Sequence, residues 1–345
     1  MKRVTTLTDI AQEAGVSPAT ASLVLNDRPA RITAATRDRV RAVAETLGYR
    51  PNTLAQSLRR QHTRAIGLIS DRIATTPFAV GIVAAAEAVA RAHGRLVFLV
   101  DTHDDPDTAT EAIAALRQHQ VTRSVYACMY HRVVDVPSDL GPHVVLCNAR
   151  APDDDVPAIV PDERRGAHDA TMQLLEAGHR RVAFVNDALD PPAATLRLAG
   201  YRDALAEAGI TADPRWVHAA DPSFDGGREA THRLLEAAPD VTGIFAFSDR
   251  IAVGCLAAAH DRGLAVPRDL SLVGFDGTDV ASYAIPPLTT VTLPHHEMGR
   301  WAATALLDAP EPVERARGET RLLRCDVVAG ASVGPPPDDV RSDAL

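Results

Sequence analysis

The chain has 345 residues, 46% of them hydrophobic and 23% charged, which is the balance of a globular protein with room for two or three domains. It contains no run of 18 apolar residues and no apolar core of a secretory signal near its first residue, so neither a membrane span nor export is expected. Lys2 is the single lysine, which excludes phosphate-binding loops and Schiff-base enzymes that depend on an internal lysine.

Charge is divided unevenly along the chain. Residues 1–64 carry eleven basic and five acidic side chains, a net charge of +6, whereas the other 281 residues carry 25 basic and 40 acidic side chains, a net charge of −15. This division predicts that the first segment meets a polyanion and that the rest does not. The four cysteines are widely separated, so we expect a reduced, cytoplasmic protein.

The first 48 residues predict three short helices. Thr8, Ser17 and Thr33 are the expected N-caps, because each hydroxyl precedes a run with apolar residues at helical spacing. Pro18 suits the first position of the second helix. With Gly15 in the turn between them, the first two helices have the geometry of a helix-turn-helix, whose second helix enters the major groove of DNA.

Residues 49–64 differ from the segments on either side. Pro51 lies near the start, and Asn52 could cap a helix that carries Leu54, Ala55 and Leu58. Such a helix is too short to be stable alone. This segment is therefore either a linker or a helix that folds on contact with a partner.

From residue 65 on, short apolar runs alternate with helical stretches. Strands are expected at 65–70, 95–100, 124–129, 143–148, 181–186, 215–219, 243–247 and 270–275, and helices at 79–93, 107–119, 163–177, 194–208, 225–237 and 249–262. This alternation predicts parallel sheets covered by helices. A break at 149–160 divides the pattern into two Rossmann-like lobes, and the Pro- and Asp-rich tail from Gly334 is expected to be disordered.

Several motifs together resemble one known family. The segment LTDIAQEAGVSPATASLVLN (7–26) is similar to the head of the LacI/GalR (lactose-repressor) family of bacterial transcription regulators. The motifs GHRRVAF (178–184), RLAGYRDAL (197–205), FSDRIAVG (247–254) and RGLAVPRDLSLVGFDGT (262–278) also stand where that family has equivalents. The resemblance covers nearly the whole chain.

The resemblance implies an α-helical helix-turn-helix head and an α/β effector body of two Rossmann-like lobes, of the periplasmic-binding-protein type. It divides the chain into a DNA-binding domain (1–49), a hinge (50–63), an effector-binding and dimerisation domain (64–333) and the disordered tail (334–345). Within the body, the N-lobe would comprise about 64–160 and 291–325, and the C-lobe about 161–290.

The family also implies which residues meet double-stranded operator DNA. They are Thr8, Ser17, Pro18, Ala19, Thr20, Ser22, Leu23, Asn26 and Arg31 in the head, and Asn52, Ala55, Gln56 and Leu58 in the hinge. Pro18 and Ala19 can touch only apolar groups such as thymine methyls. Leu23 stands where the family often has Arg or His, so part of the readout must come from DNA shape. Leu58 would wedge into the minor groove and kink the operator.

Effector-binding residues follow from the resemblance in the same way. Arg197 and Asp276 would bond vicinal hydroxyls, with Asp249 beside them, while Phe78 and Phe224 would stack on a ring. Further candidates are Asp71, Asn148, Arg150 and Asp162. Leu293 stands where the family often has Gln, so the identity of the ligand does not transfer.

Other chemistry is not expected. His295 and His296 lack a third ligand at metal spacing, and the GxSxG at 330–334 is followed by prolines that prevent the helix of a nucleophile elbow. We therefore expect no metal, no cofactor and no catalytic residue.

The sequence predicts a dimeric repressor of carbohydrate-metabolism genes. It would bind a palindromic operator of about 14–20 bp and respond to a small molecule, a sugar, held between the lobes. The dimer face is expected near 79–93, 107–119 and 249–283.

Two alternative functions share the two-lobed pattern. A transported-solute binding protein is disfavoured by the basic head, and a nucleotide-dependent enzyme by the lack of a GxGxxG after a strand.

Overall fold

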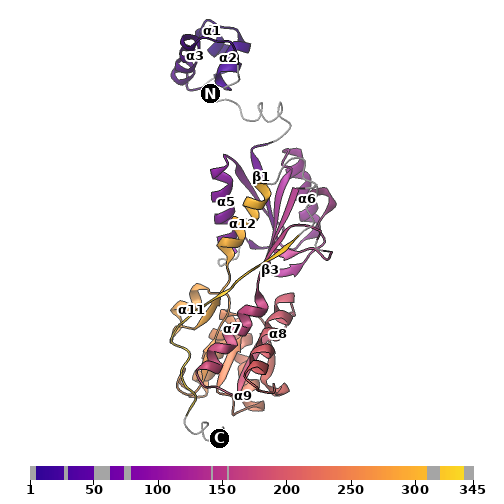
Figure 1. Cartoon of the computed structure of the whole chain (residues 1–345), viewed down its shortest axis with the longest axis vertical. Helices are drawn as coiled ribbons and strands as arrows, with labels where there is room; N and C mark the ends of the chain where they lie inside the picture. The colour runs from indigo at the N-terminus through magenta and orange to yellow at the C-terminus, as the bar shows by residue number, and fades with distance from the viewer. Residues whose placement is uncertain are drawn as a thin grey trace. The chain divides into compact units, whose positions relative to one another are not determined.

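The computed structural model describes residues 5–26, 30–49, 63–73, 79–140, 143–153, 155–308 and 319–337. The chain forms two compact units, residues 1–63 and 64–345, which we call the head and the body (Figure 1). Each is described by itself.

The described residues of the head form three helices: α1 (Leu7–Glu13), α2 (Pro18–Leu25) and α3 (Ala34–Thr46). Their buried residues make one small apolar core: Ile10, Ala11, Ala14, Ala21, Val24, Val40 and Ala44. Gly15, in the turn between α1 and α2, has a φ of +63°, a conformation that glycine adopts without strain. The predicted helix-turn-helix is confirmed.

Two of the three expected N-caps are confirmed, and the first is wrong. The Ser17 hydroxyl accepts a hydrogen bond from the Thr20 amide (3.1 Å), and Thr33 caps α3 in the same way. Helix α1 is capped by Thr6 and not by Thr8. The Thr6 hydroxyl accepts from the Asp9 amide (3.3 Å), and the Asp9 carboxylate accepts from the Thr6 amide (2.7 Å). This reciprocal pair satisfies two backbone amides at the start of the helix. Thr8 cannot form such a pair, because the residue three positions after it is an alanine, which has no side-chain acceptor.

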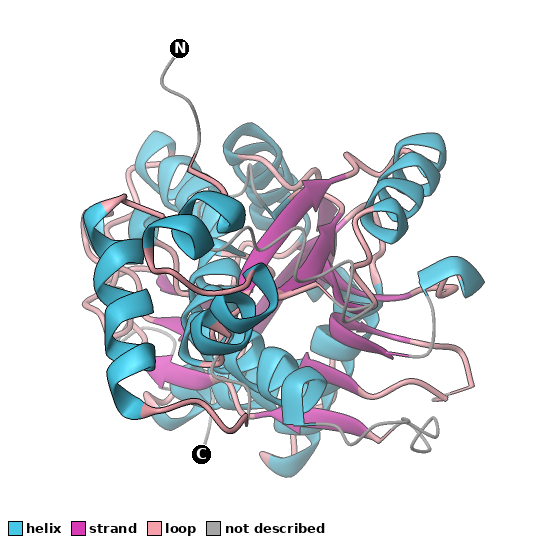
Figure 2. Ribbon diagram, turned by 90° about the horizontal axis from the view of Figure 1, so that it is seen from above, coloured by secondary structure: helices cyan, strands magenta, loops and turns pink. Residues whose placement is uncertain are grey.

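The first lobe of the body, here called the N-lobe, is built on a six-stranded parallel sheet in the order β11-β5-β4-β3-β1-β2. The strands are β1 (Ala65–Ser70), β2 (Leu96–Asp101), β3 (Arg123–Val133), β4 (His143–Arg150), β5 (Ala158–Pro161) and β11 (Thr320–Leu323). Helices α5 (Val80–Ala92) and α12 (His295–Asp308) share one apolar core with the sheet, and α6 (Pro106–Gln118) shares the other. Figure 2 shows the strands enclosed by helices.

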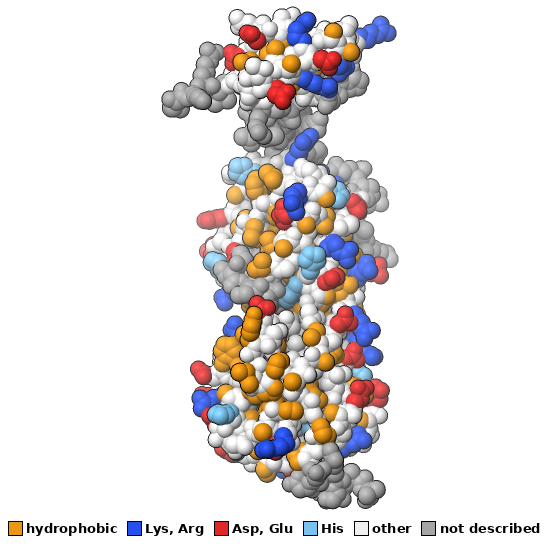
Figure 3. Space-filling model, turned by 90° about the vertical axis from the view of Figure 1, so that its left-hand side faces the viewer, with side chains coloured by type: hydrophobic (Ala, Val, Ile, Leu, Met, Phe, Trp, Pro, Cys, Tyr) orange, Lys and Arg blue, Asp and Glu red, His pale blue; other side chains and the backbone are white. Residues whose placement is uncertain are grey.

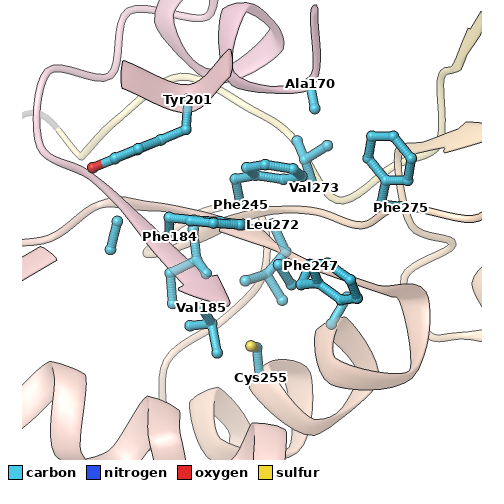
Figure 4. Close-up of a cluster of buried hydrophobic side chains, with 14 of the residues drawn as sticks. Ala170, Phe184, Val185, Tyr201, Phe245, Phe247, Cys255, Leu272, Val273 and Phe275 are labelled. Carbon is cyan, nitrogen blue, oxygen red and sulfur yellow. The ribbon is translucent and has the colours of Figure 1, made fainter. Parts of the chain in front are cut away.

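The second lobe, the C-lobe, has a four-stranded parallel sheet in the order β7-β6-β8-β9. Its strands are β6 (Val182–Asp187), β7 (Val217–Ala220), β8 (Gly243–Ala246) and β9 (Ser271–Val273). Its helices are α7 (Glu163–Glu176), α8 (Pro192–Glu207), α9 (Phe224–Ala237), α10 (Asp249–Asp261) and α11 (Asp279–Tyr283). Stacked aromatic rings fill the core, with the Phe184 and Phe245 centroids 4.7 Å apart (Figure 4).

The chain passes between the lobes three times. The crossings follow β5, β10 (Thr290–Thr292) and β11, and β10 pairs with the antiparallel β12 (Asp326–Val328). All strands and helices predicted in the body are present, although β3 continues to Val133. The sequence missed β5, which lies inside the supposed break at 149–160, as well as β10, β11 and β12. These strands have only three or four residues, so pairing with distant partners holds them rather than a local pattern.

The segment expected to be a disordered tail begins inside the C-lobe. The Gly334 amide donates to the Ser271 hydroxyl (3.0 Å), and the Gly334 carbonyl accepts from His179 Nε2 (2.9 Å). The start of the tail at 334 is therefore wrong, and residues 338–345 lie outside the described residues. The serine of the GxSxG, Ser332, is buried, and its hydroxyl donates to the Leu272 carbonyl (2.6 Å), which is a structural role.

Candidate functional site

Arg197 on α8 lies at the centre of a buried charge network. Its Nε donates to Glu163 (2.7 Å), and its Nη1 donates to Asp276 (3.3 Å) and to the Phe247 carbonyl. Its guanidinium carbon stands 3.6 Å from the centroid of the Phe275 ring. Because Arg197 is only 3% exposed, these partners compensate for the loss of water around its charge.

Close packing of α7 on α8 brings these groups together. Gly200 follows Arg197 by about one turn, and a Cβ at that position would collide with the Arg164 carbonyl oxygen of α7. The glycine lets the two helices approach until Glu163, the first residue of α7, meets the guanidinium. In the sequence, Glu163 resembles an ordinary acidic residue in the first turn of a helix, so no pattern marks it as a partner of Arg197.

The Arg197 network is joined to the segments that connect the lobes. Glu163 follows the first crossing directly. The Asp276 amide donates to the Val291 carbonyl (2.8 Å), and the Leu293 amide donates to the Asp276 carbonyl (3.3 Å), both on the second crossing. A molecule that binds at Asp276 would therefore act on the chain segments that cross between the lobes.

Asp276 has an unusual conformation and an unusual pKa. Its φ of +101° is in the left-handed region, which residues other than glycine rarely adopt. Burial raises the pKa of its carboxyl to about 8, against the opposing effect of the Arg197 charge. The resemblance placed Asp276 and Arg197 together, and the structure brings them into contact, although Arg197 is enclosed by protein groups.

Asp249 lies at the N-terminus of α10 and faces the interior of the protein. Its carboxylate accepts from the Thr278 amide (2.6 Å), from the Thr278 hydroxyl (2.9 Å) and from the Thr290 hydroxyl. Burial raises its pKa to about 6. These bonds tie α10 to the loop after Asp276 and to β10. Because its carboxylate is occupied by these protein groups, Asp249 holds the backbone around the site and is not open to a ligand. Asp162, the other acidic candidate near a crossing, caps α7 through the Arg165 amide (3.1 Å).

Asp71 and Asn148 shape the end of β3. Asp71 accepts from the Met129 amide (2.8 Å), and the Asn148 amide group donates to the carbonyls of Cys128 (3.0 Å) and Met129 (2.9 Å). At this point the pairing of β3 with β4 shifts register. The two candidates thus hold a bulge that redirects the strand. Arg150, the last residue of β4, is half-buried.

Tyr130 and His131 lie within this bulge, and neither was singled out in the sequence. Burial raises the pKa of the Tyr130 phenol, and the charged groups that act on it belong to the C-lobe: Asp276, Asp187, Arg250 and Arg197. His131 is 5% exposed, and neither ring nitrogen has a hydrogen-bond partner among the described residues. Since β3 was expected to end near residue 129, no sequence signal placed these side chains between the lobes.

The two aromatic candidates have different outcomes. Phe224, the first residue of α9, is exposed, and the Arg250 guanidinium lies 5.7 Å from its ring centroid. Phe78 lies outside the described residues.

In the head, one side of α2 is open to solvent. Ser17, Pro18 and Ala19 are exposed at its start, whereas Ala21 and Val24 face the core. The remaining candidates on this unit are exposed or half-buried: Thr8, Thr20, Ser22, Leu23, Asn26 and Arg31. The hinge candidates Asn52, Ala55, Gln56 and Leu58 lie outside the described residues.

Comparisons with known proteins identify the family. A family model described as "Bacterial regulatory proteins, lacI family" matches residues 6–52, and a "Periplasmic binding protein-like domain" matches 171–333. The transcriptional repressor CytR of Escherichia coli K12 is 32% identical over 330 residues, which cover 95% of this chain and 96% of that protein. The chain belongs to the lacI family. The transcriptional regulator GalR of the same organism is 34% identical over 308 residues, 88% of each chain.

Solved structures of LacI-family proteins agree with this. A lac repressor dimer bound to operator and the anti-inducer ONPF has a TM-score of 0.80 at 26% identity, covering 96% of this chain and all of that one. The transcriptional regulator CelR in complex with cellobiose has a TM-score of 0.67 at 28% identity, covering 95% of this chain and 99% of that one. This LacI-family protein is therefore a DNA-binding transcription regulator and not an enzyme, with a helix-turn-helix head and a two-lobed α/β body of the periplasmic-binding-protein type.

The described residues of this regulator contain neither a membrane-spanning helix nor a cluster of metal-ligating side chains. None of the helices in the described ranges has the length and hydrophobicity that a bilayer crossing requires. Among the same residues, no three His, Cys, Asp or Glu side chains are placed to share a metal ion.

Proposed function

We propose that this regulator is a cytoplasmic, dimeric repressor of carbohydrate-metabolism genes that binds a palindromic operator and is switched by a sugar between its lobes. The observation that carries the proposal is the contact of Arg197 with Glu163 and Asp276, because it joins a polar site in the C-lobe to two interlobe crossings. The relatives support it: one is a lac repressor dimer on its operator, and another is CelR with cellobiose.

In this proposal α2 enters the major groove. The N-cap and the exposed side of α2 present three hydroxyls, those of Ser17, Thr20 and Ser22, to phosphates or base edges. Pro18 and Ala19 present only apolar surface, which suits thymine methyl groups. Thr8, Leu23, Asn26 and Arg31 border the same surface, and the hinge residues Asn52, Ala55, Gln56 and Leu58 would read the operator centre.

Dimerisation is supported by exposed apolar side chains in both lobes. In the C-lobe Tyr283 is 85% exposed and Ile285 is 88% exposed, and in the N-lobe Val80 of α5 is exposed. Figure 3 views the body from the side of α5 and α11 and shows hydrophobic side chains over both lobes. Contiguous exposed apolar surface marks protein interfaces. A second copy related by a two-fold axis fits, because a palindromic operator has the same symmetry.

Strand β2 completes this proposed face. It is the last strand of the N-lobe sheet, and its Leu96, Phe98 and Leu99 side chains are exposed. An uncovered apolar edge strand invites pairing with another chain. Helix α6, also expected in the dimer face, packs Ile113 and Leu116 against its own sheet, just as α5 packs Ile82. We therefore add β2 to the expected interface.

A gel-shift titration on the upstream region of the protein's own gene tests the proposal. We expect salt-dependent binding of a dimer, weakened or strengthened by a sugar. The dimer is checked by sedimentation at the same protein concentration. Absent or salt-insensitive binding to that DNA would contradict the proposed operator.

A further inference from the structure

His131 is a buried polar side chain without a hydrogen-bond partner in the part of the chain that the structure describes. It lies within the bulge of β3 and is 5% exposed, and both of its ring nitrogens are unpartnered there. A buried imidazole without hydrogen bonds costs free energy that a purely structural role does not require. Burial lowers its pKa, so the ring is neutral, with one donor and one acceptor nitrogen.

The charges around His131 come from both lobes. They are Glu163 at the first crossing, Arg150 at the end of β4, and Arg197 on α8. The neighbouring Tyr130 is acted on by Asp187 and Asp276 of the C-lobe. The end of β3 therefore faces the C-lobe where β6 ends.

The C-lobe presents acceptors to this point. Asp187 is the last residue of β6 and is 5% exposed. Its carboxylate accepts a hydrogen bond from the Leu189 amide (2.8 Å). Next to it in the chain, the side-chain oxygen of Asn186 is buried and has no partner within the described ranges, while its nitrogen donates to the Ala194 carbonyl (3.3 Å). The carboxyl ends of parallel strands are where ligands of such sheets bind.

We propose that Tyr130 and His131 from the N-lobe and Asp187 from the C-lobe contact the effector and select it by its hydroxyl groups. This inference rests on the proposed effector site between the lobes. A hydroxyl both donates and accepts, so it satisfies a neutral imidazole, and as a donor it satisfies the carboxylate and amide oxygens at the end of β6.

Charged ligands match these groups less well. A phosphate or carboxylate group is only an acceptor, so at the end of β6 it would meet the Asp187 carboxylate and the Asn186 oxygen without giving either a donor. The Arg197 charge is already paired with Glu163, and Asp276 accepts a further hydrogen bond from its guanidinium. A nucleobase also offers N–H donors and ring-nitrogen acceptors, so the screen below includes it as the competing class.

The first test is a thermal-shift screen of the full chain. The probes are monosaccharides, polyols and disaccharides, set against nucleobases, glucose 6-phosphate, ribose 5-phosphate and gluconate. We expect an uncharged polyhydroxy compound to give the largest rise in Tm. A larger rise with a phosphate ester, an acid or a nucleobase, or no rise with any uncharged polyhydroxy probe, overturns the inference.

The second test uses variants and the best uncharged probe. His131→Phe and Asp187→Ala should each weaken its binding at least about tenfold in calorimetry. Without ligand, His131→Phe should unfold at the same or a higher temperature than the natural chain, because an apolar ring replaces an unpaired imidazole. A lower Tm together with unchanged affinity would show that His131 is structural and would refute its assignment.

Matched controls lie away from the site. His218→Phe changes a histidine of β7 that bonds the Arg215 carbonyl, and Asp240→Asn changes an exposed acid before β8, at the opposite end of the sheet from Asp187. Both should bind the probe as the natural chain does. Gel shift separates the two proposals. A natural chain that does not bind the operator DNA would refute the proposed function, whereas calorimetry of the variants tests the effector contacts independently of DNA.

Discussion

The Nε atom of Arg197 lies 2.7 Å from the Oε2 atom of Glu163, and both side chains are almost completely buried. The two residues come from different helices of the C-lobe, and Glu163 begins the helix that leaves the first interlobe crossing. A buried ion pair of this kind fixes the position of each partner, because separating them would leave an uncompensated charge. The pair therefore sets where the guanidinium meets Asp276.

Replacing Arg197 with alanine should destabilise the body. The change leaves Glu163 buried without its partner, and the expected loss in the free energy of unfolding is about 3–5 kcal/mol. Urea unfolding of the full chain measures it. Arg164→Ala, which breaks an exposed pair with Asp203 on the same helices, is the control and should change stability little. Equal losses in the two variants would contradict the role given to the buried pair.

Stability should fall as the pH rises through the titration of Asp276. The pKa of this carboxyl is raised in the folded chain to about 8, from an ordinary value of 3.8. The folded state therefore holds the proton more tightly than the unfolded state, and the stabilisation present at low pH is lost between about pH 4 and pH 8. One such group contributes a slope of at most about 1.4 kcal/mol per pH unit.

Asp276→Asn should flatten this dependence. Urea unfolding at pH 6.5 and pH 8 compares the two proteins above the titration of Asp249, whose pKa is about 6 and which acts in the same direction. If the natural chain and Asp276→Asn lose the same free energy over this interval, Asp276 is not the titrating group.

The proposed dimer face predicts different effects at the two edges of the N-lobe sheet. Leu96→Glu places a charge on β2 and should produce monomers in sedimentation velocity, since a buried unpaired carboxylate is costly in an interface. Leu322, which is 58% exposed on β11 at the other edge, is the matched control. Leu322→Glu should leave the dimer intact, and monomers from that variant alone would place the interface at the wrong edge.

The hinge prediction rests on the family resemblance, because Leu58 lies outside the described residues. Leu58→Ala removes the side chain that would unstack bases at the operator centre. We expect operator affinity to fall about tenfold or more, which corresponds to ~1.4 kcal/mol, while calorimetric binding of the sugar probe is retained. Unchanged affinity for DNA in the gel shift would disprove the wedge.

The sequence by itself determined the features that depend on neighbouring residues. The caps Ser17 and Thr33 bond amides three residues away, and the turn at Gly15 needs only a local φ, so the helix-turn-helix could be predicted. The alternation of apolar runs and helices fixed the parallel sheets for the same reason. Family motifs then pointed to Arg197 and Asp276.

Only the tertiary structure decided what these residues contact. Arg197 meets Glu163 and the Phe247 carbonyl, 34 and 50 positions away in the chain, and the bulge that turns His131 toward the C-lobe depends on Asp71, 58 positions from Met129. Contacts at such separations form only when whole sheets and helices have packed, so no local pattern encodes them. The same reason explains why Asp249, chosen for an open site, bonds threonines of the interior instead.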